Sequence, residues 1–295
     1  MLASHAKIYK CGMIQLQVLN SEFQNHPWIP GWQSRISTIK FIDKWQEVRQ
    51  DFPVACGSDV LNPYVRQWLN NKQPAFYIGR GYVGNHTQKK RRLWRVSVNG
   101  WANTVLHAIP YSRWGVMNIP RHPWKVQKIK KVLIAPSRQS TPAWSQQLPH
   151  EWAESFLNKF PGAETKIRFK QELPVQRLAN LWEDLDWADL IVTQSSAISC
   201  EAFWYGKKVI STEPCPTWAA GRTFLEDWAN PTEPLLRDAW HEHLAWSQFT
   251  IDEWATGEPL ELIQQYLGPI SSYHPMHDYN FVSKTEESQH QPPDI

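Results

Sequence analysis

The chain has 295 residues, of which 42% are hydrophobic and 20% are charged, and its formal net charge is +3. This composition favours a globular protein with a sizeable core, divided into one large or two smaller domains, and argues against a disordered chain. No apolar run approaches the roughly 20 residues of a membrane span, and the first residues lack the apolar stretch of a secretory signal. We therefore expect a cytoplasmic protein, and the small net charge does not by itself indicate a polyanionic partner.

The cysteine and tryptophan contents limit the kinds of site that the sequence can be expected to form. The four cysteines are widely spaced and include no CxxC pair, which argues against a disulfide framework or a zinc site. Reduced and mostly buried thiols are the expectation. The eighteen tryptophans are explained mainly by packing, although aromatic rings also stack on sugars and bases.

The first part of the chain has three short apolar patches, at Lys7–Tyr9, Pro53–Cys56 and Ala75–Gly79. Each patch predicts a strand, because it is short and is bounded by polar or turn-forming residues. Helices are predicted at Ile36–Gln50 and Asn62–Asn70, and the second opens on an Asn-Pro step that suits a helix start.

A Gly-, Arg- and Trp-rich stretch follows and is predicted to be irregular up to Trp114. Its glycines at Gly79–Gly84 have the spacing of a dinucleotide-binding loop, but polar cationic residues follow in place of an amphipathic helix. We therefore reject that interpretation. The run that follows interleaves cations with an aromatic residue, as a surface that tracks phosphates would. The candidate nucleic-acid residues are Arg80, Lys89, Lys90, Arg91, Arg92, Trp94, Arg95 and Arg113.

The second half of the chain alternates predicted strands and helices. A proline- and lysine-rich linker at Asn118–Lys131 precedes it, and strand, helix, strand, helix then lead into a strand–turn–helix–strand unit at Asp189–Ser211. Two more helices are predicted near the end. The predicted elements are strands Val132–Pro136 and Thr165–Lys170, and helices Pro149–Phe160, Pro174–Ala188, Glu233–Trp246 and Ile251–Leu267.

This alternation predicts a doubly wound, mostly parallel sheet in an α/β protein. We expect an α/β domain at residues 1–122 and a second α/β domain at residues 123–270. Residues 271–295 are rich in His, Pro, Gln and Ser and are predicted to be a disordered tail.

Parallel strands place the loops at their carboxyl ends on one edge of the sheet, where ligands of such folds bind. The serine pair at Ser195 and Ser196 falls where a helix should begin, so it is predicted to cap that helix and to favour an anion. Cations in the same group of loops suit a diphosphate, and Glu201 on the helix could accept from ribose hydroxyls. The alternative is an ordinary helix cap with surface cations. The candidate residues for this anionic ligand, called the donor group below, are Ser137, Arg138, Arg168, Lys170, Gln194, Ser195, Ser196 and Glu201.

The segment TQSSAISCEAFWYGKKVI resembles the donor-binding segment of two-domain glycosyltransferases with the B fold, in the branch that holds capsule-polysaccharide enzymes and phage-encoded proteins. Similar residues also occur at Leu244–Ile263 and in the RGYVG and SVNGW stretches. The resemblance implies two Rossmann-like domains facing a cleft, with the acceptor on the domain at residues 1–122 and the nucleotide-sugar donor on the domain at residues 123–270. Capsule enzymes of this branch have a His-Pro pair where this chain has Phe169-Lys170, so Arg168 with Lys170 would have to replace a histidine at the donor phosphate.

The resemblance implies glycosyl transfer from a nucleotide sugar, such as a UDP-sugar, with no tightly bound cofactor and no required metal. An inverting reaction needs a base for the acceptor hydroxyl, and Asp59 is the candidate because it follows a predicted strand at the edge facing the cleft. His86 is the second candidate. The first acceptor hypothesis is a hydroxymethylated pyrimidine in duplex DNA of a phage, modified inside the host cell.

Two other functions stay open from the sequence. The same chemistry could act on a surface polysaccharide or a lipid-linked glycan. Alternatively, the chain could be a non-catalytic module that binds a nucleotide sugar or a nucleic acid.

Overall fold

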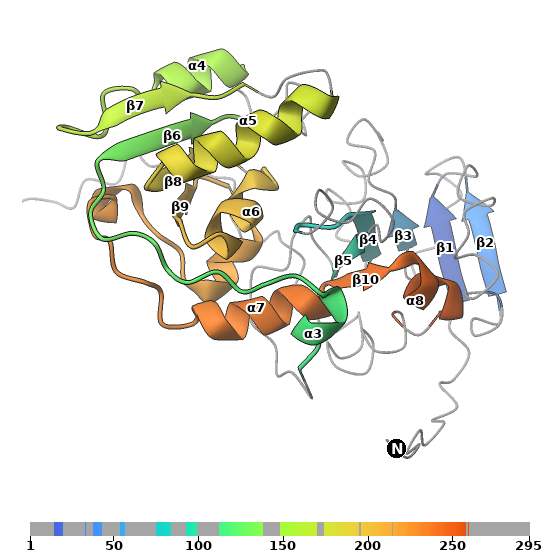
Figure 1. The fold of residues 1–295 in the computed structure, drawn as a ribbon. Helices are drawn as coiled ribbons and strands as arrows, with labels where there is room; N and C mark the ends of the chain where they lie inside the picture. Colours follow the sequence, from blue (N-terminus) through green and yellow to red (C-terminus); the bar gives the residue numbers. More distant parts are fainter. Residues whose placement is uncertain are drawn as a thin grey trace, which may run out of the picture.

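The fold is known from a computed structural model, which places two sheets side by side with helices around the second (Figure 1). Within the described part of the chain, none of the helices has the length and apolarity of a membrane span. The described residues are 15–19, 33, 38–42, 54–56, 75–83, 93–98, 112–137, 148–169, 174–194, 196–213, 215–257 and 259.

The N-terminal sheet has the strand order β10-β5-β4-β3-β1-β2. Four of its strands pair in parallel, whereas β5 and β10 pair antiparallel. Because β4 is parallel to β3 and β1, the residues that follow β4 leave the carboxyl edge of this sheet. The strands are β1 (Gln15–Leu19), β2 (Thr38–Ile42), β3 (Val54–Cys56), β4 (Ala75–Arg80), β5 (Leu93–Val98) and β10 (Gln248–Thr250).

Two elements of this sheet correct the sequence-based expectation. Thr38–Ile42 is strand β2 and lies inside the helix predicted at Ile36–Gln50; β-branched and aromatic residues favour a strand there, and β1 supplies the pairing. Leu93–Val98 is strand β5 in a stretch predicted to be irregular. Strands β3 and β4 confirm two of the predicted strands, whereas Lys7–Tyr9 and the helix at Asn62–Asn70 lie outside the described residues.

The C-terminal sheet confirms the prediction of a parallel α/β unit. Its order is β7-β6-β8-β9, and every neighbouring pair is parallel. The inner strands are buried along their length, as expected for a sheet covered on both faces, while the edge strand β7 alternates between exposed and half-buried positions. The strands are β6 (Lys131–Ala135), β7 (Glu164–Ile167), β8 (Leu190–Thr193) and β9 (Lys208–Ser211).

The side chains of alternate residues in these strands belong to two hydrophobic clusters on opposite faces of the C-terminal sheet. Leu133 and Ile191 face a cluster with α5 (Pro174–Trp187), α6 (Ile198–Trp204) and α7 (Arg237–Trp246). Their neighbours Val132 and Val192 face a second cluster that includes residues of α4 (Pro149–Glu154). The two-residue period of a strand is the cause of this division.

Two segments link the sheets. Residues 118–130, predicted as a linker, run alongside α7 in Figure 1 and bury Ile119, Val126 and Ile129. The second link is α7 followed by β10, which returns the chain to the N-terminal sheet, and then by α8 (Ile251–Thr256). Helix α8 confirms that a helix begins at Ile251, as predicted for Ile251–Leu267, and β10 lies directly before it. Residues 271–295 lie outside the described part of the chain.

Candidate functional site

The predicted site lies at the carboxyl edge of the C-terminal sheet. Because its four strands are parallel, the loops after them share one edge. Arg168 follows β7, Ser137 lies two residues after β6, and Gln194 with Ser196 follows β8. The prediction that these loops come from one edge is confirmed by this topology.

Gln194 joins the loops of this edge. Its side-chain oxygen accepts a hydrogen bond from the Ser137 backbone N–H at 2.9 Å, and its side chain is almost fully buried. Its backbone oxygen accepts from the Ser211 hydroxyl and, at 3.4 Å, from the Glu213 N–H. Gln194 therefore holds the loops after β6, β8 and β9 together, which makes it a residue that shapes the edge.

The turn between β8 and α6 presents unused hydrogen-bonding groups. Among the described residues, the Ser196 hydroxyl and the backbone N–H groups of Ser196, Ala197 and Ile198 have no protein acceptor. Ser196 is half-buried and Ala197 is exposed. Three N–H groups and one hydroxyl in one turn form a local concentration of donors, which suits an anionic group.

The prediction that Ser196 caps this helix is wrong, and Ser195 lies outside the described residues. Ala197 is the N-cap residue of α6, it is in the helical region at φ −57°, and it makes no side-chain cap. The Ser196 carbonyl oxygen is used inside the turn, where it accepts from the Ser199 hydroxyl at 2.7 Å and from the Ser199 N–H at 3.0 Å. Among the described residues, the Ser196 hydroxyl has no protein partner.

Arg168 is already engaged by a carboxylate. Its guanidinium forms an ion pair with Asp184 of α5, and the other oxygen of Asp184 binds Lys166. The Arg168 side chain is 12% exposed and that of Asp184 is 7% exposed. Two cations around one carboxylate leave a positive balance at this end of β7, but Arg168 is held and oriented by the protein. Asp184 was not among the residues that the sequence predicted for this edge, because its pairing with Arg168 depends on how α5 packs over β7.

Glu201 and the cysteines lie deeper than the edge. Glu201 belongs to the first turn of α6 and is 7% exposed, so its carboxylate lies below the surface. Cys200 and Cys215 are free and buried, as predicted. Burial raises the pKa of the Cys200 thiol well above its usual range, and Cys215 nearby raises it further, so Cys200 is not a ready nucleophile.

Several candidates lie outside the described residues. These are Asp59 and His86, the proposed bases; Arg138, Lys170 and Ser195 of the donor group; and Lys89, Lys90, Arg91 and Arg92 of the cationic run. Arg80 is the last residue of β4, but the position of its side chain is also outside the description.

Two of the predicted nucleic-acid residues are buried inside the protein. Arg113 pairs with Glu253 at 2.7 Å and stacks over Phe249, and its side chain is 6% exposed. Arg95 is buried with its guanidinium 4.6 Å from the centre of the Tyr82 ring. A guanidinium enclosed in this way is not available to a phosphate at the surface, so neither residue belongs to a nucleic-acid surface. Trp94 is half-buried.

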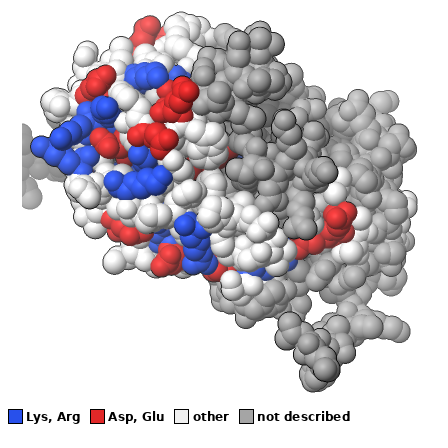
Figure 2. Space-filling view, viewed as in Figure 1, with Lys and Arg blue, Asp and Glu red and all other residues white. Residues whose placement is uncertain are grey.

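The charged side chains visible over the C-terminal sheet form no surface of one sign. Figure 2 shows blue and red side chains interspersed on the face that it views. Among the described residues, no three His, Cys, Asp or Glu side chains are grouped as metal ligands.

Two solved structures with similar folds are both KpsC enzymes of Thermosulfurimonas dismutans. A beta Kdo 2,7 transferase aligns over 85% of this chain and 99% of its own, with 12% identity and a TM-score of 0.48. A beta Kdo 2,4 transferase aligns over 79% of this chain and 91% of its own, with 15% identity and a TM-score of 0.44. No family profile matches the sequence, and no curated protein matches it. At these values neither structure identifies the reaction of this chain.

Proposed function

We propose that this chain is a glycosyltransferase that binds a nucleotide-sugar donor at the carboxyl edge of the C-terminal sheet. The observation that carries the proposal is the β8–α6 turn, where the Ser196 hydroxyl and three N–H groups have no protein acceptor among the described residues. Departure of a nucleotide builds negative charge on its phosphate. Donors that are already in place stabilise that charge without reorganisation.

The surroundings of the turn support an anionic ligand. Gln194 fixes the neighbouring loops, and the positive balance around Asp184 lies on the same edge. Protein groups of this kind can bind the diphosphate of a UDP-sugar without a metal ion, as the sequence resemblance implies. Asp59 is our candidate base for the acceptor hydroxyl, with His86 second.

The acceptor that the observations favour is a carbohydrate hydroxyl, on a surface polysaccharide or a lipid-linked glycan. Duplex DNA requires a surface of cations that reach phosphates, and phosphate contacts supply most of its sequence-independent affinity. The burial of Arg95 and Arg113 removes two cations from the set that predicted such a surface. DNA that contains hydroxymethylpyrimidine therefore becomes the alternative acceptor in the test.

The test begins with nucleotide release. The purified protein is incubated with UDP-, GDP- and CMP-sugars, and free nucleotide is measured with and without glycan acceptors and modified DNA. Slow release without an acceptor, accelerated by a glycan, supports the proposal. Acceleration by modified DNA alone would support the DNA function, and tight binding with no release would identify a binding module.

The turn is tested by two substitutions. Ser196→Ala removes the hydroxyl, and Ala197→Pro removes one N–H at a residue whose φ of −57° suits proline. Each is expected to weaken donor binding by about 1.5–3 kcal/mol, the range for hydrogen bonds to charged groups. Ser155→Ala is the matched control, because the Ser155 hydroxyl bonds the Trp152 oxygen at the end of α4. Donor affinity that is equal in all three variants would contradict the assignment.

A further inference from the structure

Gln248 connects the end of the described chain to the loop after β4. Its side-chain oxygen accepts hydrogen bonds from the backbone N–H groups of Tyr82 and, at 3.1 Å, of Val83. Its side-chain nitrogen approaches the Met117 sulfur at 3.5 Å, and the residue is fully buried. Gln248 opens β10, which pairs with β5, so the same short strand extends the N-terminal sheet and holds this loop.

Gly81 makes the close approach possible. A Cβ at this position would lie 2.7 Å from the Gln248 side-chain oxygen and 2.9 Å from the Leu93 Cβ. Both distances are shorter than ordinary contacts, so any larger residue would push the side chain of Gln248 away. Gly81 and Gln248 therefore act together to fix the path of the chain at the carboxyl edge of the N-terminal sheet.

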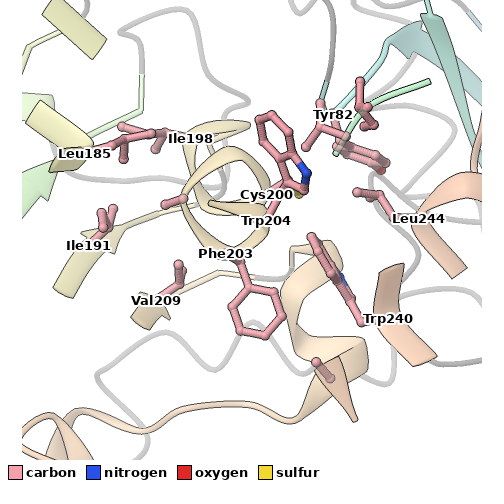
Figure 3. Close-up of a cluster of buried hydrophobic side chains, with 14 of the residues drawn as sticks. Tyr82, Leu185, Ile191, Ile198, Cys200, Phe203, Trp204, Val209, Trp240 and Leu244 are labelled. Atoms are coloured by element: carbon pink, nitrogen blue, oxygen red, sulfur yellow. The ribbon is translucent and has the colours of Figure 1, made fainter. Parts of the chain in front are cut away.

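The side chain of Tyr82, which follows Gly81 in this loop, packs in the hydrophobic core around α6. Its ring is 1% exposed, and it belongs to the cluster that contains Ile198 and Cys200 from the first turn of α6. Figure 3 draws Tyr82 and Cys200 as members of this cluster. The Arg95 guanidinium lies 4.6 Å from the ring centre. Tyr82 is thus held through its backbone by Gln248, and its ring packs in the core around α6.

This contact joins the two edges that matter for a transfer reaction. The loop after β4 leaves the carboxyl edge of the N-terminal sheet, and α6 begins at the carboxyl edge of the C-terminal sheet. Transfer between two substrates requires their reacting atoms to be held about 3–3.5 Å apart, and an error of about 1 Å costs roughly 100-fold in rate. A residue that fixes one edge against the other therefore acts on turnover.

We infer that Gln248 is a positioning residue for the transfer reaction: by fixing the Gly81–Val83 backbone, it seats Tyr82 in the core around α6 and aligns the two carboxyl edges. This inference rests on the proposed function. Gln248 itself contacts neither substrate, since it is fully buried between Tyr82, Val83 and Met117.

Three variants separate positioning from stability. Gln248→Met keeps the length of the side chain but removes the acceptor, and Gln248→Glu restores an acceptor for both N–H groups. Ser247→Ala is the matched control, because it removes a buried hydrogen bond to the His243 oxygen at the adjacent residue. Thermal unfolding of all variants is compared, and kinetics are measured well below the lowest midpoint.

The kinetic readout is the ratio of transfer to donor hydrolysis. Gln248→Met is expected to lower kcat for transfer at least 10-fold, with donor affinity and acceptor-free hydrolysis within 2-fold of the parent. Gln248→Glu is expected to recover most of the transfer rate, and Ser247→Ala to keep it. If Ser247→Ala and Gln248→Met lose transfer in proportion to their lost stability, Gln248 is merely structural and the inference fails.

Hydrogen exchange tests the coupling without any substrate. Gln248→Met is expected to accelerate exchange at Tyr82 and Val83 and also in the first turn of α6, whereas Ser247→Ala leaves both unchanged. Faster exchange at Tyr82 and Val83 alone would overturn the inference. If the parent protein neither hydrolyses nor transfers any nucleotide sugar, the proposed function fails. Exchange in α6 then decides separately whether Gln248 couples the two edges.

Discussion

Arg168 and Asp184 form an ion pair beneath the edge where the donor is proposed to bind. The pair joins the end of β7 to α5, and both side chains are largely enclosed. Lys166 shares the same carboxylate from a more exposed position, with 51% of its side chain exposed. Arg168, which the sequence predicts as a donor-binding residue, therefore has an orientation that depends on Asp184.

Removing Arg168 is expected to reduce both stability and donor affinity. Arg168→Ala leaves Asp184 with Lys166 alone, and we expect a loss of about 1–3 kcal/mol in the free energy of unfolding, measured with urea. Lys166→Ala is the matched control on the same carboxylate; because Lys166 is exposed, a loss of about 0–1 kcal/mol is expected. Equal losses in the two variants would show that burial of the pair is unimportant.

Asp184→Asn tests whether the carboxylate orients Arg168 for the donor. The amide keeps the shape of the side chain but removes its charge, and it therefore removes the ion pairs of Asp184 with Lys166 and Arg168. Donor affinity, measured by calorimetry, is expected to fall if orientation matters. An increase would instead mean that the ion pair competes with the donor for the guanidinium.

Replacing Gln194 is expected to loosen the donor edge. Gln194→Leu leaves the Ser137 N–H buried without its acceptor, which costs about 1–3 kcal/mol in the free energy of unfolding. Gln194→Glu retains an acceptor and serves as the control. Calorimetry with the donor should show weaker binding for the leucine variant, and unchanged affinity there would mean that the loop after β6 takes no part.

The C-terminal sheet was predictable because its strands are apolar runs separated by helical patterns. Runs such as Leu190–Val192 are buried on both faces and give a continuous signal. Strand β5 gave no such signal, because Arg95 and Ser97 are buried polar residues that break its alternation. Strand β10 has three residues and pairs with β5, far away in the sequence, so its existence depends on tertiary contacts.

The position of the site was predictable from topology, but its internal bonds were not. Because the strands are parallel, Ser137, Arg168 and Gln194 lie at one edge of the sheet, independently of the contacts that their side chains make. The pairing of Arg168 with Asp184 depends on how α5 is set over β7, which no local pattern reveals. The hydrogen bond from the Tyr82 N–H to the Gln248 side chain joins residues 166 positions apart in the chain.

Gly206 is expected to be intolerant of alanine. It adopts φ +88°, where an L residue is strained, and an added Cβ would lie 2.0 Å from the Pro123 oxygen. The Gly206 oxygen also accepts from the Lys125 N–H at 2.9 Å, so the segment between the sheets is docked here. Gly206→Ala should lower the free energy of unfolding by more than the roughly 1–2 kcal/mol of left-handed strain alone.

Gly162→Ala is the matched control for that prediction. Gly162 has a similar φ of +80°, but an added Cβ would meet nothing within 4 Å. Urea unfolding of this variant should therefore report the backbone strain without the clash. A loss as large as that of Gly206→Ala would show that the contact with Pro123 is not limiting.

His241 is expected to make the protein less stable in mild acid. Its ring is 1% exposed and packs edge-on against Trp114 and Trp240, and among the described residues neither ring nitrogen has a side-chain partner. The pKa of His241 is lowered from 6.5 to about 4, mainly by burial and also by the charges of Arg237 and Arg121, against the opposing effects of Asp238 and of the Arg237 backbone. The folded state therefore keeps a neutral ring where the unfolded chain takes up a proton.

The sign of the effect follows from proton binding. Between pH 6.5 and about 4 the unfolded chain binds one more proton at this position than the folded state, so stability falls as the pH falls through that window. The full difference is about 3 kcal/mol, and all of the stability is present above the unfolded pKa. His241→Phe should flatten the dependence in urea unfolding between pH 7 and 4, whereas His150→Gln, at an exposed position in α4, should not. Parallel curves for the parent and His241→Phe would show that the buried ring is protonated without cost.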